Sequence, residues 1–148
     1  MMNDMKQIKH HLTEPLLIGY AAGTLPEAFN LVVATHITMC DDCRAALAEY
    51  DAVGGEVMLH GDPVTVAEDA LAATMAMIDG GFGTDKPAPV RARNSIFPGP
   101  LQDYVSGDVE SLKWRKVGGG VSQLVLKTSK DASVRLLRIP AGTALPDH

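Results

Sequence analysis

A compact group of histidine and cysteine residues constrains this chain more than any other feature. His36, Cys40 and Cys43 are spaced four and three residues apart, so on or beside one helix their side chains point in nearly the same direction. Imidazole and thiolate groups are the ligands that zinc prefers, and structural zinc sites hold four of them in a tetrahedron. We therefore expect the chain to fold around a zinc ion, with a fourth ligand from elsewhere.

Two upstream histidines are candidates for that fourth ligand. His10 and His11 both stand on the approach to the first expected helix, and either side chain can fasten that helix to the others. The residues alone leave the choice between them open. A site closed by four protein ligands is structural rather than catalytic, because no position remains for a substrate.

A redox role is the main alternative for the two cysteines. A CxxC pair of the thioredoxin type normally opens a helix that follows a strand. Here the pair follows an apolar helical segment, and acidic neighbours such as Asp41 and Asp42 raise the pKa of a thiol beside them. These features favour metal binding, while a redox pair and two unremarkable thiols stay as alternatives.

The N-terminal half has the pattern of four short helices. Apolar residues recur at helical spacing, between residues typical of helix starts and stops. The expected helices begin at Thr13, at Thr24, after Cys40 and near Thr65, and they run to Gly23, His36, Gly54–Gly55 and Ile78. Helices of this length are marginal alone in water, so a bundle of them needs packing or a metal.

The C-terminal half changes to the alternating pattern of β-strands. Three such stretches are separated by Gly118–Gly120 and by Thr128–Asp131, which predicts an antiparallel meander. The stretches are residues 112–117, 121–127 and 133–140. The sequence therefore predicts an α+β fold.

A stretch rich in glycine and proline, from Asp79 to Pro89, separates the two halves. We expect a zinc-stapled helical domain at residues 1–80, a linker at 81–100 and a β domain at 101–148. No apolar run approaches the ~18–20 residues of a membrane-spanning helix, and no apolar signal segment follows the N-terminus. These features predict a cytoplasmic protein that does not contact the membrane.

The charge of the chain also changes between the halves. Residues 1–86 carry 4 Lys and Arg against 13 Asp and Glu, a net charge of −9, whereas residues 87–148 carry 9 against 5, a net charge of +4. A DNA-binding face needs concentrated Lys and Arg, so the acidic half argues against direct binding of nucleic acid. It favours a basic protein partner.

A resemblance to a known family follows from these motifs. His11, followed 25 positions later by His36-x-x-x-Cys40-x-x-Cys43, resembles the signature of the zinc anti-sigma family. Further stretches look like its ChrR-type branch, in which an anti-sigma domain precedes a C-terminal cupin. The stretches are Gly19–Leu25, Leu31–His36 and Cys40–Arg44 in the first domain, and Trp114–Val121 and Arg138–His148 at the start of the cupin.

The resemblance implies a function and a ligand set. It implies that His11, His36, Cys40 and Cys43 hold zinc, with His11 favoured over His10 by the family's spacing. It implies a transcription regulator, not an enzyme, that grips a sigma factor of the extracytoplasmic-function type and blocks its contact with RNA polymerase. In this branch the signal is oxidative, linked to singlet oxygen or organic peroxide.

The fourth expected helix is amphipathic, with Leu71, Met75 and Ile78 on one side. Such a helix can insert into a protein partner, or it can pack on the other three helices. The sequence leaves both roles open.

The cupin metal motif is incomplete. Gly142 and His148 match the opening Gly-x5-His, so His148 is a candidate first ligand, but the remaining ligands have no counterpart. Three or four strands also cannot close a barrel. We therefore expect a fragment of a longer protein, or pairing with a second copy through the strand edges. The alternative functions are a cupin-type metalloenzyme fragment and a CxxC redox or zinc interaction module.

Overall fold

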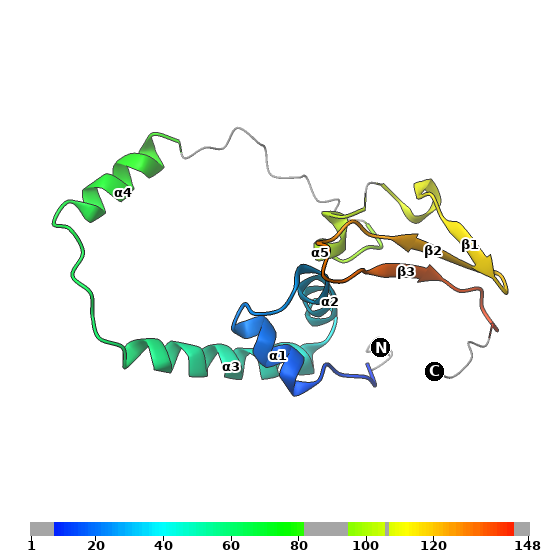
Figure 1. Cartoon of the computed structure of the whole chain (residues 1–148), viewed down its shortest axis with the longest axis horizontal. Coiled ribbons are helices and arrows are strands. Elements are labelled where there is room, and N and C mark those ends of the chain that lie inside the picture. Colours follow the sequence, from blue (N-terminus) through cyan, green and yellow to red (C-terminus); the bar gives the residue numbers. More distant parts are fainter. Residues whose placement is uncertain (1–7, 82–94, 106, 144–148) are drawn as a thin grey trace, which may run out of the picture.

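Helices come first along the chain and strands come last, as the sequence predicts (Figure 1). The computed structural model describes residues 8–81, 95–105 and 107–143. The elements in these ranges are α1 (Glu14–Ala21), α2 (Glu27–Ile37), α3 (Asp41–Leu59), α4 (Ala70–Asp79), α5 (Gly99–Gln102), the 3-10 helix η1 (Val109–Ser111), β1 (Arg115–Gly118), β2 (Val121–Val125) and β3 (Arg135–Arg138). This order confirms the predicted α+β class.

The first helix ends at the glycine that the sequence singles out. Gly23 has a φ of +67°, in the left-handed region that glycine adopts most readily. The backbone N–H groups of Gly23 and Thr24 donate to the carbonyls of Tyr20 and Gly19. This is the Schellman arrangement that closes a helix C-terminus, and it directs the chain into α2.

The third helix is longer than expected. The sequence predicts an end at Gly54–Gly55, but α3 continues to Leu59. Neither glycine has a positive φ, so neither forms the left-handed cap that would end the helix. A glycine inside a helix costs ~1 kcal/mol relative to alanine, which does not stop a long helix.

Neither α3 nor another helix of the described residues is long and apolar enough to cross a membrane.

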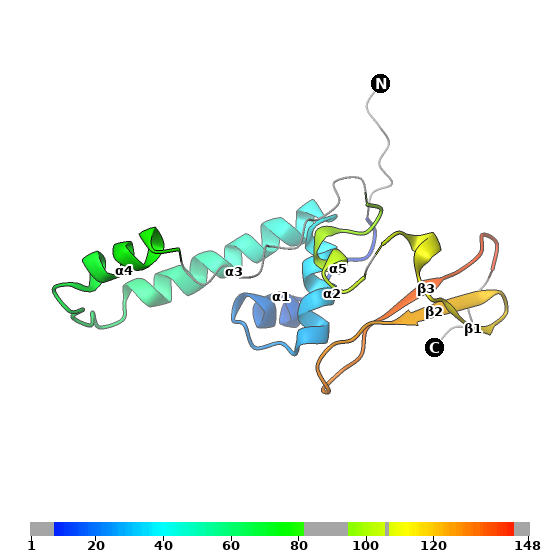
Figure 2. The same cartoon turned by 90° about the horizontal axis from the view of Figure 1, so that it is seen from above.

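The fourth helix stands apart from the first three. α1, α2 and α3 contact one another in all three pairs, whereas α4 contacts no other helix or strand of the described chain. It begins at Ala70 rather than near Thr65. Figures 1 and 2 show α3 leading away from the group, with α4 at the end of the loop that follows. The packed bundle therefore has three helices instead of the expected four, because apolar spacing does not specify what a helix packs against.

The strands form the antiparallel meander that the sequence predicts, in the order β1-β2-β3. Ser122 of β2 pairs with Lys116 on one side and with Arg138 on the other. Gly118 at the end of β1 and the turn residues Gly119 and Gly120 all have positive φ, a conformation that is strained for residues with a side chain. β2 and β3 lie within the stretches expected from the alternating pattern, whereas β1 ends one residue beyond its expected stretch, at Gly118.

Helix α2 also packs against the C-terminal half. A buried apolar cluster joins α2 to α5 and to the flanks of the sheet; its members are Ala28, Leu31, Leu101, Val105, Leu126 and Val134. The two carboxylate oxygens of Glu27 accept hydrogen bonds across the same boundary, from the Tyr104 hydroxyl at 2.7 Å and from the Ser129 backbone N–H at 2.5 Å. Most of the expected linker, residues 82–94, lies outside the described residues, so the proposed domain limits stay a prediction.

Candidate metal centre

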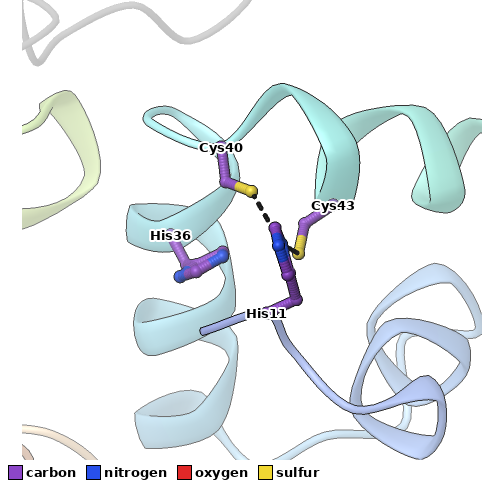
Figure 3. A group of neighbouring side chains, drawn as sticks. All are labelled: His11, His36, Cys40 and Cys43. Atoms are coloured by element: carbon purple, nitrogen blue, oxygen red, sulfur yellow. Dashed lines mark hydrogen bonds between the residues drawn. The ribbon is translucent and has the colours of Figure 1, made fainter. Parts of the chain in front are cut away.

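Four of the side chains that the sequence singles out meet where three helices begin or end (Figure 3). His36 lies in the last turn of α2, Cys40 is the N-cap of α3, and Cys43 lies in its first turn. His11 comes from the segment immediately before α1. The potential ligand atoms of all four residues lie within 4.8 Å of one another.

The imidazole of His11 faces both sulfur atoms. Its Nδ1 lies 3.3 Å from Sγ of Cys40 and 3.6 Å from Sγ of Cys43. The backbone N–H of Leu12 also donates to Sγ of Cys43, at 3.3 Å. The segment before α1 is therefore tied to the start of α3 through a side chain and through the backbone.

The chemistry and the burial of this cluster fit a metal ion. Cys40 and Cys43 are both free thiols and are each 3% exposed, in a cluster with Leu17 of α1. Nε2 of His36 is buried and has no hydrogen-bond partner among the described residues. A buried polar atom without a partner costs stability, and coordination to a metal removes that cost. Two imidazoles and two thiols at this separation make a metal site of four potential ligands.

Burial raises the pKa of the Cys43 thiol above its ordinary value. The neighbouring Cys40 thiol and the Asp42 carboxylate act in the same direction, whereas the Leu12 N–H acts against them. Redox-active thiols usually have a lowered pKa, so this environment does not favour the redox alternative. A metal ion must displace the thiol proton, so metal binding weakens as pH falls.

The turn between α2 and α3 has its own support, which the sequence reasoning missed. The Arg44 guanidinium donates to the backbone carbonyl of Ile37 at 2.5 Å and forms an ion pair with Asp41. The carbonyl lies at the C-terminus of α2, where backbone acceptors lack helical partners. Arg44 therefore bridges the end of α2, which contains His36, to the start of α3, which contains Cys43. The spacing of Asp41 and Arg44 on one helix face was the available signal.

The remaining candidates from the sequence do not join this cluster. His10 is described, is exposed, and does not belong to the group of four. His148 lies outside the described residues, so its role as a first cupin metal ligand stays a prediction.

The fold and the site together define a class of protein. Three packed helices meet at two histidines and two cysteines, and an antiparallel three-stranded sheet follows. The class is that of a small helical domain built around a potential metal centre and joined to a β structure.

Comparison with known proteins identifies the family. No protein-family model matches the sequence. The chain is 50% identical over 141 residues to the anti-sigma-E factor ChrR of Cereibacter sphaeroides; the match covers 95% of this chain but 65% of that relative, so the chain spans less than two thirds of its length. The structure is also similar to a chain in the crystal structure of Rhodobacter sphaeroides SigE in complex with the anti-sigma ChrR, with a TM-score of 0.73 and 46% identity over 96% of this chain and 75% of that chain. The chain therefore belongs to the family of ChrR-type anti-sigma factors.

Proposed function

We propose that this chain is an anti-sigma factor that binds and occludes a sigma factor of the extracytoplasmic-function type. The observation that carries the proposal is the likeness, over 96% of the chain, to a chain from the complex of SigE with ChrR. A sigma factor covered in this way cannot engage the core RNA polymerase. Such a regulator needs a binding surface rather than a catalytic centre, so we propose no enzymatic activity.

We propose that the metal is zinc and that its ligands are His11, His36, Cys40 and Cys43. Two thiolates and two imidazoles are a typical ligand set of structural zinc, and four protein ligands leave no open position. Bound zinc supplies a cross-link between chain segments. In this chain the ligands join the segment before α1 to the end of α2 and the start of α3.

We propose that the sigma factor binds the far half of α3 and α4. Val57 and Met58 of α3 are 69% and 82% exposed, and Leu71 and Ile78 of α4 are 75% and 58% exposed. Large apolar side chains that are this exposed are candidates for an interaction site. The sequence leaves two roles open for α4, and its lack of contact with other described elements supports insertion into the partner over packing on the bundle.

The wider setting is proposed from the family. We propose a cytoplasmic regulator in a response to singlet oxygen or organic peroxide. We also propose that residues 1–80 form the anti-sigma domain, 81–100 a linker, and 101–148 the start of a cupin domain with His148 as its first metal ligand. Pairing of two copies through strand edges is the alternative to a longer chain that continues the barrel.

A binding assay with purified sigma factors tests the function. We expect the zinc-loaded chain to bind a sigma factor of this type from the same organism and to inhibit transcription by the polymerase that contains it. Replacing both cysteines, Cys40→Ser with Cys43→Ser, should abolish both effects because the cross-link is lost. His10→Ala changes an exposed histidine outside the cluster and should abolish neither. A zinc-loaded wild type that binds none of these sigma factors would contradict the proposal.

A further inference from the structure

Among the four potential ligands, His11 is held differently from the others. His36, Cys40 and Cys43 lie in or beside helices, so the helical backbone fixes the positions and directions of their Cα–Cβ bonds. His11 lies before α1, outside regular structure, and its side chain is 42% exposed. Its ring orientation therefore depends on the groups that it contacts.

The two ring nitrogens of His11 face different groups. Nδ1 lies 3.3 Å and 3.6 Å from the sulfur atoms of Cys40 and Cys43. On the opposite side of the ring, Nε2 lies 3.8 Å from a carboxylate oxygen of Asp42, which is an ion-pair distance. One nitrogen is thus directed to the potential metal site and the other to a carboxylate.

We propose that Asp42 is a positioning residue for the metal centre and that His11 coordinates the metal through Nδ1. The negative charge of the Asp42 carboxylate, 3.8 Å from Nε2, favours a proton on that nitrogen, which leaves the Nδ1 lone pair free for the metal. Carboxylates opposite a ligating imidazole nitrogen commonly orient the ring and raise its basicity. This inference rests on the proposed metal site and adds a residue outside its four ligands.

The position of Asp42 in the chain explains why it can act on His11. It stands between Cys40 and Cys43 in the first turn of α3, so the backbone that places the two sulfurs also places the carboxylate. The neighbouring Asp41 is engaged elsewhere, since it forms an ion pair with Arg44. Asp41 therefore offers a matched control from the same helix turn, with the same charge and the same favourable position at a helix N-terminus.

The tautomer of His11 gives the first test. Long-range proton–nitrogen NMR on the zinc-loaded full chain, with ring signals assigned by His11→Gln, distinguishes a protonated Nε2 from a protonated Nδ1. We expect zinc on Nδ1 and the proton on Nε2. Coordination through Nε2 would overturn the proposal, even in a chain that binds zinc and a sigma factor.

Zinc affinity gives the second test. We expect Asp42→Ala to lower the affinity for Zn²⁺ by roughly 10- to 100-fold in competition with a chromophoric chelator, as is typical when an outer carboxylate is removed. Asp42→Asn removes the same charge and should lower the affinity by a similar factor, whereas Asp41→Ala, the same substitution one residue earlier, should change the affinity much less than Asp42→Ala. Equal effects of Asp41→Ala and Asp42→Ala would overturn the positioning role while leaving the metal site intact. A wild type that binds no Zn²⁺ would overturn the inference and the proposed metal site together.

Discussion

The four residues of the candidate metal centre are positioned in two ways: three by the local backbone and one by contacts with distant segments. His36, Cys40 and Cys43 span one helix end and the next helix start, so the turn between α2 and α3 sets their separation. Arg44 supports that turn through the Ile37 carbonyl. His11 reaches the centre from a distant segment and depends on contacts made only in the folded chain. Loss of His11 should therefore loosen the segment before α1 without disrupting the turn between α2 and α3, since α1 itself packs on both of these helices.

His11→Ala and His10→Ala separate the two upstream histidines. We expect His11→Ala to weaken zinc binding by more than the roughly 10- to 100-fold typical of residues outside the ligand set, because a ligand is lost. His10→Ala should leave zinc binding close to that of the wild type, since His10 is exposed and outside the cluster. Chelator competition measures both variants. A larger loss in His10→Ala than in His11→Ala would contradict the proposed ligand set.

The sequence predicted the residues of the cluster better than the contacts around it. The spacing of His36, Cys40 and Cys43 follows helix geometry, which short-range reasoning captures. The choice of His11 over His10 rested on family resemblance, because two adjacent residues before a helix have no periodicity to separate them. The approach of Asp42 to His11 joins residues far apart in the chain, which spacing alone does not reveal.

The C-terminal ends of helices α1 and α3 differ in whether the glycine near the predicted end takes a positive φ. Gly23 does, and α1 ends two residues before it, at Ala21. Gly54 and Gly55 do not, and α3 runs through them. A sequence shows the glycines but not their φ angles, which explains why one helix end was predicted correctly and the other was not.

Two glycine substitutions should have opposite effects on stability. At Gly23, with a φ of +67°, an alanine would be strained, so Gly23→Ala should lower the free energy of unfolding by about 1–2 kcal/mol. At Gly55, in a helix with open space around an added Cβ, Gly55→Ala should raise it by about 0.4–1 kcal/mol. Urea unfolding of the zinc-loaded chain measures both changes. A stabilising Gly23→Ala would show that α1 does not end as described.

The contact between α2 and the C-terminal half should show in the titration of Tyr104. Its hydrogen bond to Glu27, together with burial, raises the pKa of this phenol above its ordinary value of 10.0. The folded state thus holds the proton more tightly than the unfolded state does. The stabilisation is complete below the unfolded-state pKa and is lost as pH rises through the folded-state pKa.

Spectrophotometric titration of the phenol groups checks this contact. We expect Glu27→Gln to lower the pKa of Tyr104, because the carboxylate that opposes phenolate formation is removed. Tyr104→Phe identifies which titration step belongs to Tyr104. An unchanged titration in Glu27→Gln would show that α2 and Tyr104 are not joined as described.

At the scale of the whole molecule, helix α2 takes part both in the His/Cys cluster and in the core shared with the sheet. Its last turn contributes His36 to the potential metal site, and Ala28 and Leu31 pack into the core shared with the sheet. The far half of α3 and α4 extend beyond this core, and the side chains of α4 are exposed from Leu71 onward. The sequence predicted the helices and the strands, but not the shared core or the isolated α4, because both depend on contacts between distant segments.

The isolated position of α4 predicts that its apolar side chains contribute to binding and little to stability. Leu71→Glu should leave the thermal midpoint within a few degrees of the wild type, because surface substitutions without native contacts usually change stability by no more than about 0.5 kcal/mol. It should weaken sigma-factor binding at least about 10-fold, since a buried charge would replace an apolar contact. Isothermal calorimetry measures the binding.

Ile96→Glu is the matched control for this prediction. Ile96 is also an exposed apolar residue, at 73%, but it lies outside α3 and α4. We expect it to retain sigma-factor binding. If Leu71→Glu and Ile96→Glu weaken binding equally, α4 is not the specific binding element.

The metal content of the protein decides whether this helical domain is built around zinc. It is measured by elemental analysis of protein purified without added metal, for the wild type and for Cys40→Ser. We predict about one zinc per chain in the wild type, as a closed four-ligand site requires, and loss of zinc together with helicity in the variant. A wild type without zinc, with two freely titrating thiols or a disulfide between Cys40 and Cys43, would contradict the metal centre on which the proposed function depends.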